Sequence, residues 1–308
     1  MEYITIAGLD KSVSRLIMGS DYFTPDIMDR IKDILDAYLE IGGNAIDTAH
    51  IYAGGQSEVA IGQWLTGRNR DDIVLFTKGA HHDASGPRVN KAAIDHDLSC
   101  SLERLKTDYV DLYALHRDDP SVAVGEIVEA LNAHIEAGRI RAIGGSNWTH
   151  ERLQEANDYA LAHGLQGFTF SSPNLSLAKA NEPYWAGCVS ADEKTCAWHR
   201  AHAFPLLSWS SQARGFFTGR YRPEDRSDAD TVRVFYSDAN WERLWRAEKL
   251  AKERGVTTIQ IALAYVLQQP FPTCALIGPQ NRAEMLSCGD ATEIRLTQAE
   301  LDWLDLTA

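Results

Sequence analysis

Four ionisable side chains, Asp47, Tyr52, Lys78 and His116, are of the types that deliver a proton to a carbonyl oxygen. A phenol titrates at about pH 10, so Tyr52 needs a neighbouring positive charge to stabilise its phenolate. Lys78 can supply that charge, and Asp47 would keep a buried Lys78 cationic and fix its direction. His116 can hydrogen-bond a carbonyl oxygen, orient it and share in proton delivery. The set therefore suits a reaction in which an alkoxide develops.

Proton donors alone do not reduce a carbonyl group. The set contains neither an activated Ser or Cys nucleophile nor a third metal ligand, so the reducing equivalent has to come from a cofactor, and nicotinamide hydride is the simplest candidate. Singly, each residue has an ordinary explanation: Lys78 as a solvated charge, Asp47 as a turn cap and His116 as a satisfied polar group. Their joint placement argues for function, because each follows a run typical of a β-strand.

Short apolar, β-rich runs alternate along the chain with amphipathic stretches of helical length, a pattern typical of repeated βα units around a parallel sheet. We expect strands at 15–18, 44–47, 73–78, 110–116, 140–146, 167–172, 204–210 and 274–278. We expect helices near 26–41, 57–66, 90–105, 121–137, 150–163, 190–202, 239–254 and 280–288, with further helical patterns at 258–268 and 297–305. Asp26, Asn90, Ser121 and Thr149 are the expected N-caps.

Eight βα units without a linker favour an α/β fold of the (β/α)8 TIM-barrel type, with residues 1–308 as a single domain. A doubly wound sheet is the alternative, weakened as a dinucleotide binder because no GxGxxG motif follows the first strand. The polar stretch 221–238 has no clear period and is expected to be a surface insertion. Since the chemistry of such barrels collects at the carboxyl ends of the strands, the four ionisable side chains should face one pocket.

The composition is that of a soluble globular protein, and the formal net charge of −13 argues against nucleic acid or an anionic membrane as a partner. No basic segment followed by a sustained apolar run marks the N-terminus, and no run of about 18 apolar residues occurs, so neither secretion nor membrane spanning is expected. Five cysteines without a CxxC pair predict free thiols in the cytoplasm. Cys196 with His199, and His81 with His82 and Asp83, are too few ligands to predict a metal site.

Three segments resemble the aldo-keto reductase family. That family carries its catalytic Asp and Tyr in a segment similar to GGNAIDTAHIYAGGQSEVAIGQWL (42–65), and its catalytic His in one similar to TDYVDLYALHRDD (107–119). Its nicotinamide-binding Ser-Asn pair lies in a motif similar to AGRIRAIGGSNW (137–148). The resemblance runs from about residue 14 to the end. It implies that Asp47, Tyr52, Lys78 and His116 form a catalytic tetrad, and that bound NADPH is the hydride donor.

The resemblance also implies a set of cofactor contacts. Ser146 and Asn147 match the carboxamide pair, whereas Ser172 stands where the family has Gln and Trp209 where it stacks a Tyr on the nicotinamide. Arg220 is a further electrostatic candidate beside the pyrophosphate. The expected cofactor residues are Gly19, Ser20, Asp47, Ser146, Asn147, Ser172, Trp209, Ser210, Gln212, Arg214, Gly278, Gln280, Arg282 and Glu284.

The segment 278–284 is less basic than its family counterpart, which presents Lys and Arg to the 2′-phosphate. Arg282 alone can pair bidentately with a phosphate, whereas Glu284 would repel one or bond the adenosine. NADP(H) is therefore the first expectation by resemblance, and NAD(H) is the alternative.

Expected substrate contacts follow the strands. Aromatic walls with few polar anchors suit an aldehyde or ketone with an apolar, aromatic or sugar-like face as the small-molecule partner. The chain stops soon after the pattern at 297–305, from which we expect an open pocket; no feature of the sequence indicates an oligomeric state. The expected substrate residues are Tyr22, Tyr52, His81, His116 and Trp148, with Phe23, His82, Tyr184 and Trp185 as further walls.

Two other classes of function stay open. Related barrels bind NADP(H) while serving a partner protein, so a nucleotide-binding regulatory or redox-sensing subunit is one alternative. A metal-dependent isomerase or hydrolase that uses His116, Asp118 and Asp119 is the other. Turnover with NADPH separates the first alternative from a reductase, and sensitivity to chelators identifies the second.

Overall fold

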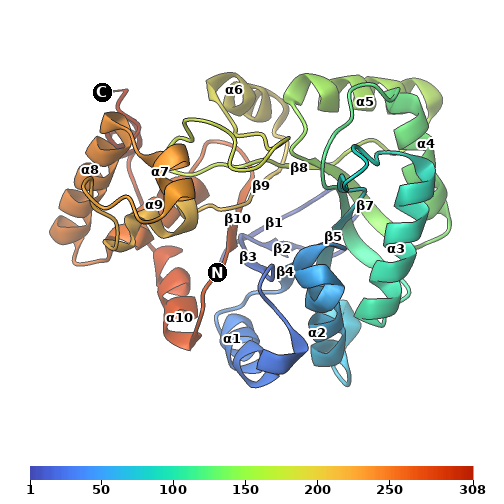
Figure 1. Cartoon of the computed structure of the whole chain (residues 1–308), viewed down its shortest axis with the longest axis horizontal. Coiled ribbons are helices and arrows are strands. Elements are labelled where there is room, and N and C mark those ends of the chain that lie inside the picture. The colour runs from blue at the N-terminus through green and yellow to red at the C-terminus, as the bar shows by residue number, and fades with distance from the viewer. Residues whose placement is uncertain (308) are drawn as a thin grey trace.

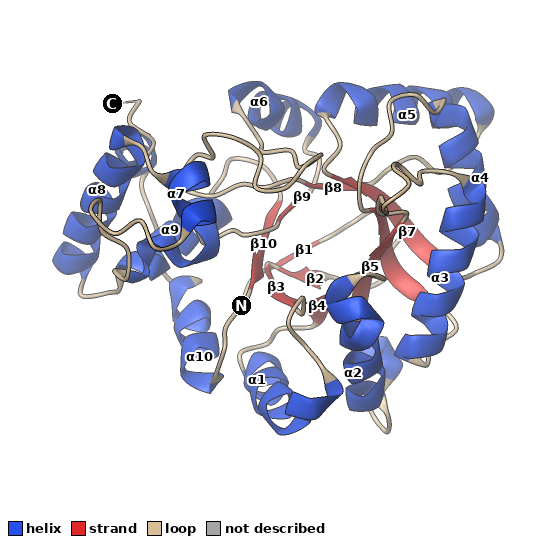
Figure 2. Ribbon diagram, viewed as in Figure 1, coloured by secondary structure: helices blue, strands red, loops and turns tan. Residues whose placement is uncertain are grey.

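The computed structural model describes residues 1–307, and its centre is a closed barrel of eight parallel strands. The strands pair in the order β10-β3-β4-β5-β6-β7-β8-β9, with the helices outside them (Figures 1 and 2). The expected (β/α)8 barrel is confirmed. The barrel strands are β3 Leu16–Gly19, β4 Ala45–Asp47, β5 Val74–Gly79, β6 Val110–Leu115, β7 Ile140–Ser146, β8 Phe170–Ser172, β9 Leu206–Ser208 and β10 Thr273–Ile277.

Helices follow the strands as the sequence pattern indicated. The bounds are α1 Met28–Glu40, α2 Gln56–Leu65, α3 Lys91–Leu105, α4 Val124–Glu136, α5 His150–His163, α6 Glu193–His202, α7 Ala229–Phe235, α8 Asp238–Arg254, α9 Thr258–Leu267, α10 Arg282–Ala291 and α11 Gln298–Leu304. Helices α1 to α9 lie between successive barrel strands, on the outside of the barrel, which is the arrangement that parallel neighbours require, and α10 and α11 follow the last strand, β10. Within residues 1–307 none of these helices is long and apolar enough to cross a membrane.

Side chains alternate between the two faces of each strand and so build two apolar layers. Leu75 faces the outer layer between strands and helices, whereas Phe76 faces the interior of the barrel. Inside, the rings of Phe76 and Phe170 meet edge to face, with their centroids 5.3 Å apart. The Lys78 ammonium lies 4.6 Å from the centroid of the Phe76 ring. The packed interior thus forms an apolar floor beneath the carboxyl ends of the strands.

Two of the four expected N-caps are confirmed. The side chain of Asn90 accepts a hydrogen bond from the Ala93 N–H, and that of Thr149 accepts one from the Arg152 N–H. The prediction for Asp26 was wrong, because it lies inside the 3-10 turn Pro25–Ile27 that precedes α1.

The prediction for Ser121 was also wrong. Its N–H and hydroxyl both donate to the carboxylate of Asp119, at 3.1 and 2.6 Å, in a turn before the helix. Helix α4 is capped by Ala123 instead, without a side-chain hydrogen bond. A local side-chain turn has therefore replaced the expected cap.

The stretch 221–238, which we expected to be a surface insertion, is mostly exposed over residues 222–230 and includes a short helix that the sequence pattern did not indicate. It contains α7, capped by Asp228, whose carboxylate accepts from the Thr231 N–H at 3.0 Å. Val234 and Phe235 are buried, and the Phe235 ring lies 6.2 Å from that of Phe216, centroid to centroid. The helix is short and only one of its faces is apolar, so its period is hard to see in the sequence.

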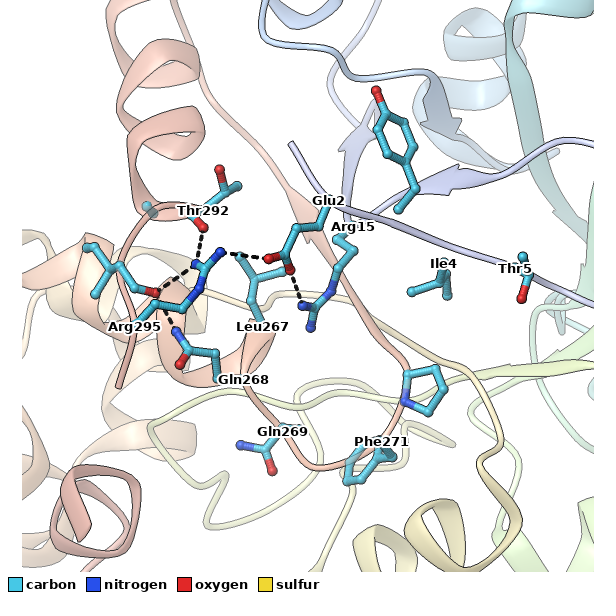
Figure 3. Close-up of a pocket in the computed structure, with 14 residues that line it drawn as sticks. Glu2, Ile4, Thr5, Arg15, Leu267, Gln268, Gln269, Phe271, Thr292 and Arg295 are labelled. Carbon is cyan, nitrogen blue, oxygen red and sulfur yellow. Dashed lines mark hydrogen bonds and ion pairs between the residues drawn. The ribbon is translucent and has the colours of Figure 1, made fainter. Parts of the chain in front are cut away.

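A hairpin of β1 (Tyr3–Ile4) and β2 (Val13–Ser14), which the sequence did not indicate, lies near the amino ends of the barrel strands. A cavity of about 930 Å³ opens beside it. Figure 3 shows the Glu2 carboxylate between Arg15 and Arg295, at 2.7 Å from each guanidinium. These three are the charged side chains of this cavity, and the single carboxylate of Glu2 is shared between the two guanidinium groups.

Close packing of α2 on α3 supports the turn between β4 and α2. Arg104, near the end of α3, donates to the His50 carbonyl at 2.9 Å and pairs with Glu58 at 3.2 Å. A Cβ at Gly62 would lie 2.1 Å from the Arg104 carbonyl oxygen, so only glycine allows this approach.

Gly62→Ala is therefore expected to lower the free energy of unfolding by about 1–3 kcal/mol, because the clash is with backbone and cannot be relieved by a side-chain rotation. Chemical denaturation measures the change. The control is Gln63→Ala, at an exposed position of the same helix. Equal unfolding midpoints for the two variants would contradict the expectation.

Candidate functional site

A cavity of about 990 Å³ opens at the carboxyl ends of the strands. It brings Asp47, Tyr52, Lys78 and His116 together from three successive strand ends. Of the other expected site residues, its wall includes Gly19, Ser20, Tyr22, His81, His82, Ser146, Asn147, Tyr184, Trp185, Trp209, Ser210, Gln212, Arg214, Arg220, Gly278, Gln280 and Glu284.

Lys78 is the centre of the ionisable group. Its ammonium forms an ion pair with the Asp47 carboxylate, donates to the Thr48 carbonyl at 2.9 Å and donates to the Tyr52 hydroxyl at 3.3 Å. Only 1% of the residue is exposed. All three N–H bonds of this buried cation are therefore directed at oxygen atoms.

The sheet register sets these contacts. Asp47 pairs with Phe76 across β4 and β5, so Lys78 lies two residues beyond, on the same face of the next strand. The chain after β4 is held to β5 by hydrogen bonds from the Thr48 N–H to the Phe76 carbonyl, 2.8 Å, and from the His50 N–H to the Lys78 carbonyl, 2.9 Å. This extension of the ladder places Tyr52 above the ion pair.

A chain of hydroxyls fixes the same turn from below. Ser57 lies 2.7 Å from the Ser20 hydroxyl and 2.9 Å from that of Thr48, oxygen to oxygen. Ser20 also donates to the Asp47 carbonyl at 2.7 Å. Ser20 therefore serves as a support for Asp47 as well as part of the cavity wall.

His116 completes the group from β6. Its backbone N–H donates to the Gly79 carbonyl at 2.8 Å, and its ring lies edge-on to Tyr52 with centroids 5.5 Å apart. The Nδ1 atom is buried and has no hydrogen-bond partner among the described residues. Burial, with the nearby charges of Lys78 and Arg117, holds the pKa of His116 well below its usual range. The imidazole is therefore neutral at pH 7.

Burial also governs the other three groups. It raises the pKa of Tyr52 well above 10, and the Asp47 charge adds to this effect, so the phenol carries its proton at neutral pH. It lowers the pKa of Lys78, whereas the Asp47 carboxylate opposes that change. Burial raises the pKa of Asp47 to about 6, against the charge of Lys78. At pH 7 the geometry corresponds to a salt bridge beside a protonated phenol.

Asn147 lies between the ionisable group and Trp209. Its side-chain N–H groups donate to the His116 carbonyl and the Ser146 hydroxyl, both at 3.2 Å. Its Oδ1 accepts from the Trp209 indole N–H at 3.1 Å. The residue adopts a positive φ of 60°, which Asn tolerates better than most residues. Through Asn147 the ends of β6, β7 and β9 are linked by polar contacts.

Three expected contacts are corrected by the structure. Ser172 is fully buried and is not part of the cavity wall, so its hydroxyl is not placed to reach a ligand there; its carbonyl accepts from the Ser146 hydroxyl at 3.1 Å. Trp148 is 2% exposed and lies behind the wall. Its indole donates to the Arg117 carbonyl at 3.1 Å and packs edge-on against Phe168. Phe23 is likewise a core residue rather than a wall residue.

Arg282 is the fourth correction. Its guanidinium forms ion pairs with Glu40 and Asp33 on α1 and is not part of the cavity wall. Glu284 does border the cavity, where it accepts from the Gln280 N–H at 2.8 Å and from the Asn281 amide at 2.9 Å. This end of the cavity is therefore polar, but the segment 278–284 contributes no cation to the cavity wall.

Several wall residues were missed by sequence reasoning. Arg117 follows His116 directly and could have been found by that adjacency. Cys188 comes from a segment without a recognisable pattern, and Gln260 comes from the helical pattern at 258–268, which carries no site motif, so only the fold brings them here. The missed residues include Asp21, Arg117, Cys188, Tyr221, Asp228, Gln260 and Cys288.

No group of three or more His, Cys, Asp or Glu side chains in the part of the chain described is placed to hold a metal ion. The acids of the metal-dependent alternative have other partners. Asp118 pairs with Arg152 at 3.3 Å, and Asp119 accepts from Ser121. They do not converge with His116.

The family model for the aldo/keto reductase family matches residues 16–306, which is nearly the whole chain. The chain belongs to the aldo/keto reductase family. Members of this family are oxidoreductases that act on carbonyl compounds and generally bind nicotinamide cofactors. The resemblance seen in the sequence is thus confirmed at the level of the family.

Individual relatives agree over most of their length. Aldo-keto reductase YhdN of Bacillus subtilis is 29% identical over 310 residues, covering 95% of this chain and 89% of that protein. Norsolorinic acid reductase B of Aspergillus parasiticus is 28% identical over 284 residues, covering 88% and 72%. The solved structure of glycerol dehydrogenase AKR11B4 from Gluconobacter oxydans superimposes with a TM-score of 0.79 at 25% identity, covering 98% of this chain and 94% of that one.

Proposed function

We propose that this aldo/keto reductase reduces an aldehyde or ketone to the alcohol with NADP(H), using Tyr52 as the general acid. One observation carries the proposal: the buried Lys78 ammonium contacts the Asp47 carboxylate and the Tyr52 hydroxyl at the same time, inside the cavity. A buried cation beside a phenol stabilises the phenolate that forms when the phenol gives up its proton, which is what proton donation by Tyr52 requires. His116, 5.5 Å from Tyr52 ring to ring, borders the same space.

Each residue has a distinct role in the proposed reaction. Tyr52 hydrogen-bonds the carbonyl oxygen and gives it a proton as the alkoxide develops. Lys78 stabilises the phenolate that this leaves, and Asp47 keeps Lys78 charged and directed. His116 is neutral and orients the carbonyl through a ring N–H, since an imidazole retains one donor in that state.

The residues present fit a nicotinamide dinucleotide. The cavity extends from Trp209 and Asn147 past Ser210, Gln212 and Arg214 to the segment 278–284, so it offers an aromatic face, amide groups and a cation in series. When bound, the cofactor supplies the hydride that reduces the carbonyl carbon. A cytoplasmic location accords with the five free cysteines.

The test is consumption of NADPH with a panel of aldehydes, ketones and sugars. Turnover that depends on the carbonyl compound supports the proposal. Tight NADPH binding without turnover of any carbonyl would instead favour the regulatory or redox-sensing alternative.

The pH dependence of the rate offers a second test. Reduction needs the proton held by Tyr52 and Lys78, so the rate falls once that pair has lost a proton at high pH. Of the two, Lys78 has the lowered pKa, and the Asp47 carboxylate is what opposes the lowering. Asp47→Asn is therefore expected to move the basic limb of the pH profile of kcat/KM to lower pH, by about 1 unit or more. Stopped assays across a pH series measure it.

The matched control is Asp36→Asn, which removes an exposed carboxylate of α1 that pairs with Arg68. Its basic limb should coincide with that of the parent protein. A basic limb that stays in place in Asp47→Asn would show that Lys78 does not set it.

The choice between NADP(H) and NAD(H) depends on the segment 278–284. Family membership supports NADP(H), whereas the ion pairs of Arg282 with Glu40 and Asp33 favour NAD(H) as the alternative. Because that guanidinium is engaged away from the cavity, Arg282→Met is expected to change the Kd of NADPH by no more than about twofold. Fluorescence titration with NADPH and NADH measures both constants. A loss of tenfold or more that is specific to NADPH would mean that Arg282 leaves α1 to bind the 2′-phosphate.

A further inference from the structure

Arg117 is a buried cation in the wall of the active cavity without an acidic partner. Only 7% of the residue is exposed, and it borders the same space as Tyr52, His116 and Cys188. Among the residues that the structure describes, no carboxylate forms an ion pair with its guanidinium. The next residue, Asp118, turns to Arg152 instead, at 3.3 Å.

The other buried arginine among the described residues, and several partly buried ones, do have acidic partners. Arg243, 9% exposed, pairs with Asp305 at 3.8 Å. Arg104 and Arg70, which are partly buried, pair with the fully buried Glu58 and Asp111. Burying a charge without a counter-ion costs free energy, so Arg117 differs from these three arginines.

The contacts of Arg117 hold the side chain in place and leave some of its N–H donors available. Nη1 donates to the His116 carbonyl at 2.8 Å, and Nε donates to the Ala186 carbonyl at 3.3 Å. A Cβ at Gly187 would lie 3.3 Å from the Arg117 Cδ, so this loop packs directly against the side chain. A guanidinium has five N–H donors, and three here have no acceptor within residues 1–307.

We propose, building on the proposed reductase function, that Arg117 binds an anionic group of the substrate, so that the preferred carbonyl compound carries a carboxylate or a phosphate. Arginine suits either group because its planar fork pairs bidentately with both. The position supports a substrate contact rather than a cofactor contact, since Arg117 follows His116 directly and its loop partners are Ala186 and Gly187. The cavity cations Arg214 and Arg220 lie in the separate segment after β9.

The neighbouring His81 and Lys78 offer no free positive charge to an anion, which leaves Arg117 to bind it. His81 borders the cavity with its ring 4.8 Å from that of His116, and burial lowers the pKa of His81 to about 4. A neutral imidazole can donate one hydrogen bond but supplies no charge. Lys78 is already neutralised by Asp47. On the His116 side of the cavity, Arg117 is thus the cation without a counter-ion among the described residues.

The test compares paired substrates that differ in charge. Para-carboxybenzaldehyde is set against methyl para-formylbenzoate, and glyceraldehyde phosphate against glyceraldehyde; the two pairs separate carboxylate from phosphate recognition. The parent protein should prefer at least one anionic partner by about tenfold or more in kcat/KM. Arg117→Met should lower kcat/KM for that anion by about 10- to 100-fold, mainly through KM, and for its neutral partner by no more than about threefold.

Two further variants separate binding from packing. Arg117→Lys keeps the charge but loses the planar guanidinium that pairs bidentately. Its kcat/KM for the anionic substrate should lie between the values of the parent protein and of Arg117→Met. Arg200→Met removes an exposed arginine of α6 and should leave both substrates unchanged. Equal losses for anionic and neutral partners, or a rise in the Kd of the cofactor without a change in selectivity, would overturn the proposal.

Binding is also measured without turnover. The alcohol product of the carboxylate substrate, para-hydroxymethylbenzoate, is titrated against the tryptophan fluorescence of the protein, to which Trp185 and Trp209 of the cavity contribute. Its Kd should rise about tenfold or more in Arg117→Met. If that rise occurs while no carbonyl is reduced, the anion site stands and the reductase function fails. If carbonyls are reduced and both Kd and selectivity are unaffected, the anion site fails alone.

Discussion

Tyr52→Phe is expected to lower kcat for carbonyl reduction by about 10²- to 10⁴-fold, the range that a positioned general acid contributes. The substitution removes one oxygen atom, the one that lies 3.3 Å from the Lys78 ammonium. The ring, its edge contact with His116 and the Asp47 to Lys78 ion pair all stay. Steady-state kinetics with a simple aldehyde measure the loss.

Cofactor affinity should be unchanged in this variant, which fluorescence titration with NADPH verifies. Tyr159→Phe is the matched control, because it removes a phenol that lies on α5 and bonds Glu129 outside the cavity. Retention of more than a tenth of the parent kcat in Tyr52→Phe would transfer the proton-donor role away from Tyr52.

Lys78→Met should abolish measurable reduction and also destabilise the fold by about 3–5 kcal/mol, since it leaves the Asp47 carboxylate buried without a counter-ion. Asp47 is 3% exposed, and its pKa is already about 6 with Lys78 present. Without that cation the pKa rises further. Chemical denaturation across a pH series measures the effect.

The sign of the pH effect follows from the raised pKa. When a carboxyl group binds its proton more tightly in the folded state than in the unfolded state, the free energy of unfolding of the protein rises as the pH falls through the folded-state pKa. The deficit of Lys78→Met should therefore be largest at neutral and alkaline pH and shrink toward acid pH. A deficit that grows on acidification would contradict this assignment.

The double variant Asp47→Asn with Lys78→Met separates stability from catalysis. It removes both charges together, and replacing a buried ion pair by neutral groups is often close to neutral for stability. The double variant should recover most of the lost free energy of unfolding and none of the activity. Recovery of activity would show that the ion pair serves only the fold.

The elements that could be predicted from the sequence are those with strong local patterns. Apolar runs followed by helical periods indicated every barrel strand, and the N-caps at Asn90 and Thr149 were found because the capping contact is local. The predicted N-cap at Ser121 was wrong because a local turn with Asp119 competes for the same groups. Helix α7 was missed because seven residues with one apolar face carry little periodic signal.

For the site, residue type and strand-end position predicted that Asp47, Tyr52, Lys78 and His116 would share one cavity. That inference needed only the alternation of side chains along a strand and the common carboxyl edge of parallel strands, both of which are properties of the backbone. The directions of individual side chains were not accessible in this way. Trp148 and Ser172 also lie at strand ends, yet both point into the protein.

The sequence by itself therefore determined the barrel, the cavity edge and the chemical types assembled there, because these follow from short-range pattern and strand geometry. The tertiary structure decided which charges are free. Arg282 is engaged by Glu40, 242 residues away in the sequence, whereas Arg117 has no acidic partner among the described residues. Both are arginines shortly after a barrel strand, Arg117 in the loop after β6 and Arg282 at the start of α10, and long-range contacts distinguish them, since the partner of a flexible charged side chain depends on what the fold places beside it.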